Sequence, residues 1–232
     1  MPMALTEERK ENLKRKIMFL YLKYGFDGIS MDEIAGRLHV GKPTLYKYFK
    51  SKEDIVRGME RFTTERMAAP LSAESGIDGV LDGMAEIYCN GIALALFSGS
   101  KYMSDLKNGY PDLFQEHIRT IEEFIGRFRK FYEEAAEKGY CRGLSLPLVG
   151  EQLRRMLPTV IDEEYLERHH LTLAETIRDY YRMFLHQIIS DEYQYVISRE
   201  ETYAFCEALT GMLEGFMSDR KELSAESPKQ SV

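Results

Sequence analysis

The chain has 232 residues, of which 44% are hydrophobic and 30% are charged, and its formal net charge is −7. This length suits one large domain, or a small domain followed by a larger one, with a sizeable buried core. The longest apolar run, around Ile92–Phe97, falls well short of the ~18–20 residues that span a membrane, so we expect no membrane partner. The N-terminal segment lacks the apolar stretch of a signal peptide, and we expect a cytoplasmic protein.

The three cysteines lie far apart in the sequence, at Cys89, Cys141 and Cys206, with no Cys-x-x-Cys pair. This spacing fits a reduced cytoplasm better than a disulfide framework. Whether one of the three thiols is redox-active stays open at the level of the sequence.

Charge is unevenly distributed along the chain. Residues 1–66 contain 14 Lys and Arg against 10 Asp and Glu, whereas the remainder contains 17 basic and 28 acidic residues. A basic N-terminal region on an acidic body indicates that only the N-terminal region meets a polyanion such as DNA.

The pattern of apolar residues predicts an all-α fold, because no segment shows the sustained alternation of a strand. The first helix is expected over Thr6–Tyr24 and ends at Gly25. Ser30 and Glu33 form a capping-box pattern that begins a short second helix. His39-Val40-Gly41 interrupts it, and a third helix is expected over Lys42–Phe49.

Ser51 is expected to cap a fourth helix that continues to Met67. Glycine, proline and small polar residues between Ala68 and Gly79 place a domain junction there. We therefore predict a DNA-binding domain over 1–67, with a helix-turn-helix core of about 29–49, a helical domain over 68–219, and a disordered tail over 220–232.

The larger domain is expected to consist of long helices. Their predicted ranges are Val80–Phe97, a helix from Pro111 that ends at Gly139, Pro147–Arg168, Thr172–Ser190 and Glu200–Met217.

Two short helices joined by a tight break, with longer helices before and after, are typical of a helix-turn-helix. Leu45 and Phe49 lie one turn apart and would hold the third helix to the core, so that its other side chains face a DNA groove. Tyrosine and lysine side chains suit phosphate oxygens, and capped helix N-termini offer main-chain N–H groups to phosphates. The expected DNA-binding residues are Ser30, Lys42, Pro43, Thr44, Tyr46, Lys47, Tyr48 and Lys52.

The stretch GFDGISMDEIAGRLHVGKPTLYKYFKSKE, residues 25–53, resembles the TetR family of bacterial transcriptional regulators. The resemblance implies that Lys42, Pro43 and Thr44 touch bases at the start of the recognition helix. It also implies that Tyr46 and Tyr48 touch phosphates or bases, and that Lys52 meets the DNA backbone.

Two positions depart from the family pattern. His39 stands where the family often has glycine, and histidine tolerates a left-handed backbone better than most other residues. Gly41 stands where the family often has serine, and glycine is an acceptable N-cap without a hydroxyl. Neither change breaks the motif, although both leave the helix boundary open.

The resemblance further implies a homodimer that binds a pseudo-palindromic double-stranded DNA operator, with its two recognition helices ~34–36 Å apart or a multiple of that spacing. Residues on the helices at Pro147–Arg168 and Thr172–Ser190 are the candidates for the dimer interface, although their faces also suit an ordinary core. The expected interface residues are Leu153, Leu157, Ile161, Ile177, Tyr181, Phe184 and Ile188.

A small-molecule effector is expected to bind inside the larger domain. An aromatic lining would favour an apolar or aromatic effector, although such residues at helical spacing also occur in a plain core. The expected lining residues are Tyr88, Ile92, Phe97, Tyr102, Met103, Phe114, Phe124, Phe128 and Tyr132.

Other functions find less support. Glu167 and His170 have metal-ligand spacing on a helix, but the second such pair of a di-metal site is missing, so we expect no metal and no cofactor. Phosphate-binding glycine loops, Gly-x-Ser-x-Gly and His-Glu-x-x-His motifs are also missing, and we expect no enzyme. The alternatives are a TetR-like dimer that acts through protein partners without DNA, or an enzyme. Repressor and activator are not distinguished, although release by an effector favours a repressor.

Overall fold

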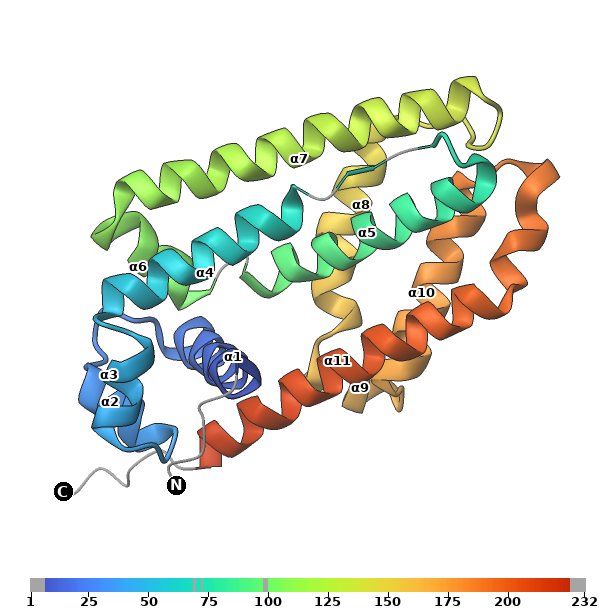
Figure 1. Cartoon of the computed structure of the whole chain (residues 1–232). Helices are drawn as coiled ribbons and strands as arrows, with labels where there is room; N and C mark the ends of the chain where they lie inside the picture. Colours follow the sequence, from blue (N-terminus) through green and yellow to red (C-terminus); the bar gives the residue numbers. More distant parts are fainter. Residues whose placement is uncertain (1–6, 69, 72, 98–99, 226–232) are drawn as a thin grey trace. The chain divides into compact units, whose positions relative to one another are not determined.

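The structure is a computed structural model that describes residues 7–68, 70–71, 73–97 and 100–225 (Figure 1). The described residues form helices and no strand, apart from a single antiparallel bridge between Cys141 and Ile189. The prediction of an all-α fold is therefore confirmed.

The chain divides into two compact units. The first comprises Met1–Arg66, Phe97–Arg119 and Gly215–Val232, and the second comprises Met67–Leu96 and Thr120–Glu214. The first division lies next to the boundary expected at Met67, but the first unit also includes residues 97–119 and 215–219 of the segment assigned to the larger domain.

The first unit is built from short and medium-length helices. They are α1 (Glu7–Tyr24), α2 (Met31–Arg37), α3 (Lys42–Tyr48), α4 (Lys52–Met67) as far as Arg66 and α6 (Lys101–Gly109). The first part of α7 (Pro111–Glu137), as far as Arg119, and the last part of α11 (Glu200–Ala225), from Gly215, also belong to this unit.

Apolar side chains at helical spacing build the core of the first unit. Ile17, Leu20 and Ile34 are fully buried, as is Leu45 of α3. Tyr102 and Leu106 of α6 belong to the same apolar cluster. Removing this much apolar surface from water holds together helices that are too short to be stable alone.

Helix α6 was not predicted from the sequence. Its N-cap Ser100 accepts a hydrogen bond from the Met103 amide at 3.3 Å. The helix has nine residues, so its apolar pattern is too short to stand out, and its buried residues Tyr102 and Leu106 are held by distant parts of the chain.

The second unit is built mainly from longer helices. They are α8 (Leu146–Val160), α9 (Glu163–His169), α10 (Leu173–Ile188) and the 3-10 helix η1 (Asp191–Ser198). The unit also contains α5 (Gly76–Phe97) as far as Leu96, α7 from Thr120, and α11 (Glu200–Ala225) as far as Glu214.

Helix α5 lies inside the second unit. A side chain at Gly83 would meet the Phe131 ring at 2.3 Å, and one at Gly91 would meet Leu157 at 2.6 Å, so both glycines permit close helix packing. Among the described helices, α5 alone is long and apolar enough to cross a membrane. However, 44% of its apolar 18-residue window is buried, and the core helix of a soluble protein meets the same criterion.

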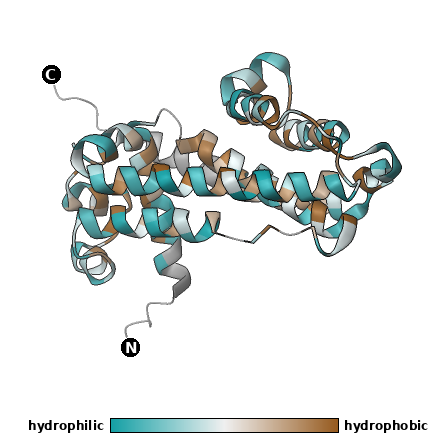
Figure 2. Ribbon diagram, turned by 90° about the horizontal axis from the view of Figure 1, so that it is seen from above, coloured by the Kyte–Doolittle hydropathy of each residue, from teal (hydrophilic) through white to brown (hydrophobic). Residues whose placement is uncertain are grey.

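Hydrophilic and hydrophobic residues alternate along most helices (Figure 2), as amphipathic packing requires.

Two predicted helix boundaries in the second unit were wrong. The helix expected over Pro147–Arg168 is divided into α8 and α9, because the Asp162 carboxylate accepts from the Tyr165 amide at 2.7 Å and starts a new helix. Helix α11 continues to Ala225, beyond the expected end at Met217. Of the tail expected over 220–232, residues 220–225 are therefore helical, and 226–232 lie outside the described residues.

Candidate nucleic-acid interface

A left-handed residue makes the turn between α2 and α3. The φ angle of His39 is +50°, and the amides of His39 and Val40 donate to the carbonyls of Gly36 and Ala35 at 3.1 and 3.0 Å. Gly41 is the extended N-cap of α3, and α3 begins at Lys42 as expected. The local sequence therefore fixes both the position and the shape of the turn.

Helix α3 has one buried face and one outward face. Leu45 is 0% exposed and Phe49 is 5% exposed, so both side chains hold the helix to the core of the first unit. The outward face consists of Lys42, Pro43, Tyr46 and Lys47, which are exposed, and Thr44, which is half-buried. Six residues of the predicted DNA-binding set thus lie on one helix, and four of them are exposed to solvent.

The Lys42 ammonium pairs with the Asp32 carboxylate of α2. Both side chains are more than half exposed, so the pair contributes about 0–1 kcal/mol. A phosphate or a guanine acceptor can replace Asp32 at little cost, and Lys42 remains available to a nucleic acid.

Tyr48 and Lys52, two of the predicted phosphate contacts, have polar groups that face the protein rather than solvent. The Tyr48 hydroxyl is buried without a hydrogen-bond partner among the described residues, and its ring lies 6.3 Å from that of Phe49. The Lys52 ammonium donates to the carbonyls of Phe26 and Asp27 at 2.9 and 3.1 Å. The Tyr48 hydroxyl therefore faces away from solvent. Two of the three N–H donors of the Lys52 ammonium are used in hydrogen bonds within the protein.

Ser30 acts as the N-cap of α2. Its hydroxyl oxygen accepts from the Glu33 amide at 3.2 Å, and the Ser30 amide donates to the Glu33 carboxylate at 2.7 Å, which completes the predicted capping box. Hydrogen bonds from the Ser30 amide and hydroxyl hold the pKa of Glu33 below its usual value. The hydroxyl of Ser30 is thus engaged in stabilising α2.

Residues 20–59 match the family model for bacterial regulatory proteins of the tetR family (TetR_N). This segment contains the whole of α2, the left-handed turn and α3. The helix-turn-helix segment matches the TetR family. The resemblance inferred from residues 25–53 is confirmed for this segment.

Solved structures show the same fold at low sequence identity. A TetR-family transcriptional regulator from Marinobacter aquaeolei VT8 is 15% identical, with a TM-score of 0.50 over 86% of this chain and 98% of that chain. The ketosteroid transcriptional regulator KstR2 of Mycobacterium tuberculosis is 14% identical, with a TM-score of 0.51 over 80% of this chain and 97% of that chain. A search of curated proteins found no match.

Most residues expected at a dimer interface lie inside the second unit. Six of them are at most 7% exposed, namely Leu153, Leu157, Ile177, Tyr181, Phe184 and Ile188, and Ile161 is half-buried. They pack within the second unit because they occupy the inward faces of α8 and α10. Exposed apolar side chains on the same two helices are Leu148, Met156 and Met183.

The residues expected to line an effector site are divided between the units. Phe97, Tyr102, Met103 and Phe114 belong to the first unit, and Tyr88, Ile92, Phe124, Phe128 and Tyr132 belong to the second. The Tyr88 ring lies 4.9 Å from that of Tyr181 and 6.2 Å from that of Phe184, so residues of the two predicted sets meet in one aromatic cluster.

A buried polar network in the first unit was not anticipated from the sequence. The Tyr102 hydroxyl donates to Glu60 at 2.6 Å, and His117 Nδ1 lies 2.7 Å from the other Glu60 oxygen. Burial and the neighbouring Glu60 carboxylate raise the pKa of Tyr102, so its hydroxyl remains a donor. The residues are 42 and 57 positions from Glu60, and no local pattern connects them.

Metal-ligating side chains are scattered over the described part of the chain. Within it, three or more His, Cys, Asp or Glu side chains nowhere gather in a way that could hold a metal. His170 ends α9 with a φ of +54°, which gives the Glu167–His170 segment a role in terminating a helix.

Proposed function

We propose that the protein is a cytoplasmic, homodimeric, sequence-specific DNA-binding repressor, which a small apolar or aromatic effector releases from its operator. The observation that carries the proposal is the outward face of α3, where Lys42, Pro43, Tyr46 and Lys47 are exposed while Leu45 is fully buried. A helix held in this way can enter a major groove without rearranging its own core.

The individual residues receive different roles under this proposal. Lys42, Pro43 and Thr44, at the start of α3, are the proposed contacts to base edges. Tyr46 and Lys47, in its second turn, are the proposed contacts to phosphates. Ser30 supports the reading helix through the cap of α2, and the half-buried Tyr48 supports it through packing.

Selection of bound sequences from random duplex DNA, followed by affinity measurements at several salt concentrations, tests this function. Lys47→Ala should lower affinity for all sequences and reduce the slope of log affinity against log salt by about 0.9 per protomer, because one phosphate contact is lost. Lys42→Ala should in addition relax the preference at one base position.

Lys130→Ala is the matched control for this experiment, since it removes an exposed lysine from the second unit. It should change neither affinity nor slope appreciably. Recovery of no preferred sequence, with dimers that do not retard DNA at low salt, would instead support action through protein partners. Turnover of a substrate without any DNA binding would support an enzyme.

For the dimer, we propose that the exposed apolar side chains Leu148, Met156 and Met183 take the place of the buried residues expected from the sequence. Two recognition helices on a two-fold axis then read the two halves of a pseudo-palindromic operator. An effector would have to disturb the spacing of this pair of helices. The effector can do so only if it binds the two conformations of the protein with different affinities.

For the effector, the aromatic residues of the second unit are the proposed lining, in particular Phe124, Phe128 and Tyr132. The chain contains no tryptophan, so Phe128→Trp introduces a single fluorescent reporter among them. Quenching or a spectral shift on addition of an apolar compound, together with release of DNA, would identify an effector of the proposed class.

A further inference from the structure

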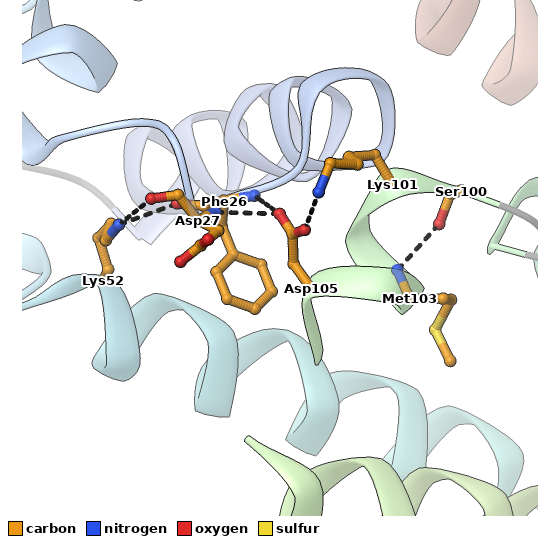
Figure 3. A network of polar contacts seen from close by, with 7 residues as sticks. All are labelled: Phe26, Asp27, Lys52, Ser100, Lys101, Met103 and Asp105. Carbon is orange, nitrogen blue, oxygen red and sulfur yellow. Dashed lines mark hydrogen bonds and ion pairs between the residues drawn. The ribbon is translucent and has the colours of Figure 1, made fainter. Parts of the chain in front are cut away.

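The loop that connects α1 to α2 is held by a carboxylate from α6. The amides of Phe26 and Asp27 both donate to Asp105 Oδ2, at 2.8 and 3.0 Å (Figure 3). Asp105 is 79 residues away from Phe26 in the sequence, and its side chain is only 3% exposed. These are charge-assisted hydrogen bonds in a site that water does not reach easily, which makes them strong.

A cation holds the same loop from the opposite side. The Lys52 ammonium donates to the carbonyls of Phe26 and Asp27, so the peptide groups of this loop lie between a lysine of α4 and an aspartate of α6 (Figure 3). The carboxylate binds the N–H groups and the ammonium binds the C=O groups. The loop therefore has little freedom to shift in either direction.

The side chain of Phe26 anchors the loop further. Its ring centroid lies 5.6 Å from those of Tyr21, Tyr102 and Tyr110, and the residue is 2% exposed. Backbone and side chain are thus both fixed against α6 and its neighbours. The chain then enters α2 at Ser30, only three residues after Asp27.

The environment of Asp105 favours its charged form. Burial raises its pKa, but the hydrogen bonds from Lys101 and from the amides of Asp27 and Phe26 outweigh burial and leave the pKa below the usual value. The carboxylate is therefore ionised at neutral pH. It faces the loop and Lys101, and α3 is not among its hydrogen-bond partners.

We propose that Asp105 is a positioning residue for DNA recognition, which fixes the entry of the chain into α2 and thereby the place of α3 on the operator. This inference rests on the proposed function. It assigns to a buried carboxylate of α6, outside the family-matched segment 20–59, an indirect influence on operator affinity, through the loop before α2.

The direction in which Asp105→Ala changes operator affinity distinguishes a positioning role of Asp105 from a purely electrostatic effect of its charge. Removing a negative charge from a DNA-binding protein by itself strengthens binding to a polyanion. Asp105→Ala should do the reverse and weaken operator binding on the order of 10-fold or more, because two charge-assisted hydrogen bonds to the loop are lost. The salt slope should stay unchanged, since no phosphate contact is removed.

Two variants accompany Asp105→Ala. Asp112→Ala removes an exposed carboxylate at the start of α7 and should leave affinity equal or slightly higher. Asp105→Asn keeps the volume and one oxygen acceptor, and it should lose less affinity than Asp105→Ala. If Asp105→Ala does not fold, the operator affinity of Asp105→Asn is measured in its place.

Hydrogen exchange of the full-length protein provides a readout without DNA. The amides of Phe26 and Asp27 should exchange on the order of 10-fold faster in the Asp105 variants, while the amides of α10 should keep their protection. Wild-type affinity in Asp105→Ala, or unchanged exchange at Phe26 and Asp27, would overturn the inference. If the wild-type protein selected no DNA sequence, the proposed function would fail, and the exchange measurement would still decide whether Asp105 holds the loop.

Discussion

Two left-handed turns flank α2, and they are maintained in different ways. Gly25, before α2, has a φ of +73°, and His39, after α2, has a φ of +50°. A side chain at Gly25 would meet Asp105 Oδ2 at 2.1 Å, and the loop that follows is held by Asp105 and Lys52. The backbone of the turn at His39 is closed by hydrogen bonds to Gly36 and Ala35, a few residues earlier.

The comparison shows that similar backbone angles can have different tolerance for substitution. At His39 the left-handed conformation is a local strain that a non-glycine residue sustains at the end of a helix. At Gly25 the same conformation is combined with the close approach of a distant carboxylate. Only glycine meets both demands, and the turn before α2 is therefore tied to the tertiary structure.

The largest expected effect is that of Gly25→Ala. The left-handed backbone and the collision with Asp105 should together lower the free energy of unfolding by about 2 kcal/mol or more. Urea unfolding followed by circular dichroism measures this change. Gly28→Ala is the control, because a side chain there meets nothing within 4 Å, and it should be close to neutral. Equal effects of the two substitutions would mean that the left-handed backbone and the nearby Asp105 place no special demand on position 25.

A smaller effect of opposite sign is expected for His39→Gly. Relief of the left-handed strain should raise the free energy of unfolding by about 0.5–1 kcal/mol. Thermal or urea unfolding at neutral pH measures the gain. His170→Gly, at the other left-handed histidine, should behave similarly at the end of α9. A loss of stability in both variants would mean that the histidine side chains contribute more than the strain costs.

The smallest effect is expected in the pH dependence of the turn before α2. The folded pKa of Asp105 lies below its usual value of 3.8, so its contribution is fully present above about pH 4 and is lost as the pH falls through the folded pKa. The stability difference between the wild type and Asp105→Asn should therefore be constant near neutrality and shrink below about pH 4. Unfolding curves at a series of pH values test this, and a difference that stayed constant below about pH 4 would contradict it.

Local signals in the sequence were sufficient for the helix-turn-helix. The capping box of Ser30 and Glu33, the left-handed His39 and the start of α3 at Lys42 all depend on residues within one or two turns of one another. Such features are encoded by neighbouring residues, and their physical basis can be recognised without knowing the rest of the fold.

Features that depend on distant contacts could not be recognised in the same way. The contact of Lys52 with DNA stays a prediction, and the hydrogen bonds from its ammonium to carbonyls about 25 residues away could not be foreseen. The periodic apolar residues of α8 and α10 fit an interface as well as a core, because helical spacing does not reveal which surface covers a face. Asp162 is the N-cap of α9, but the apolar pattern continues on both sides of it. The sequence therefore predicted one helix where there are two.

Tyr102 and Asp105 are three residues apart in α6, so they project from the same side of that helix. One holds Glu60 of α4, and the other holds the loop before α2. A rotation of α6 about its axis would displace both side chains together and could not release one contact while preserving the other. The two contacts therefore form a single thermodynamic unit, and their energies are expected to be cooperative rather than additive.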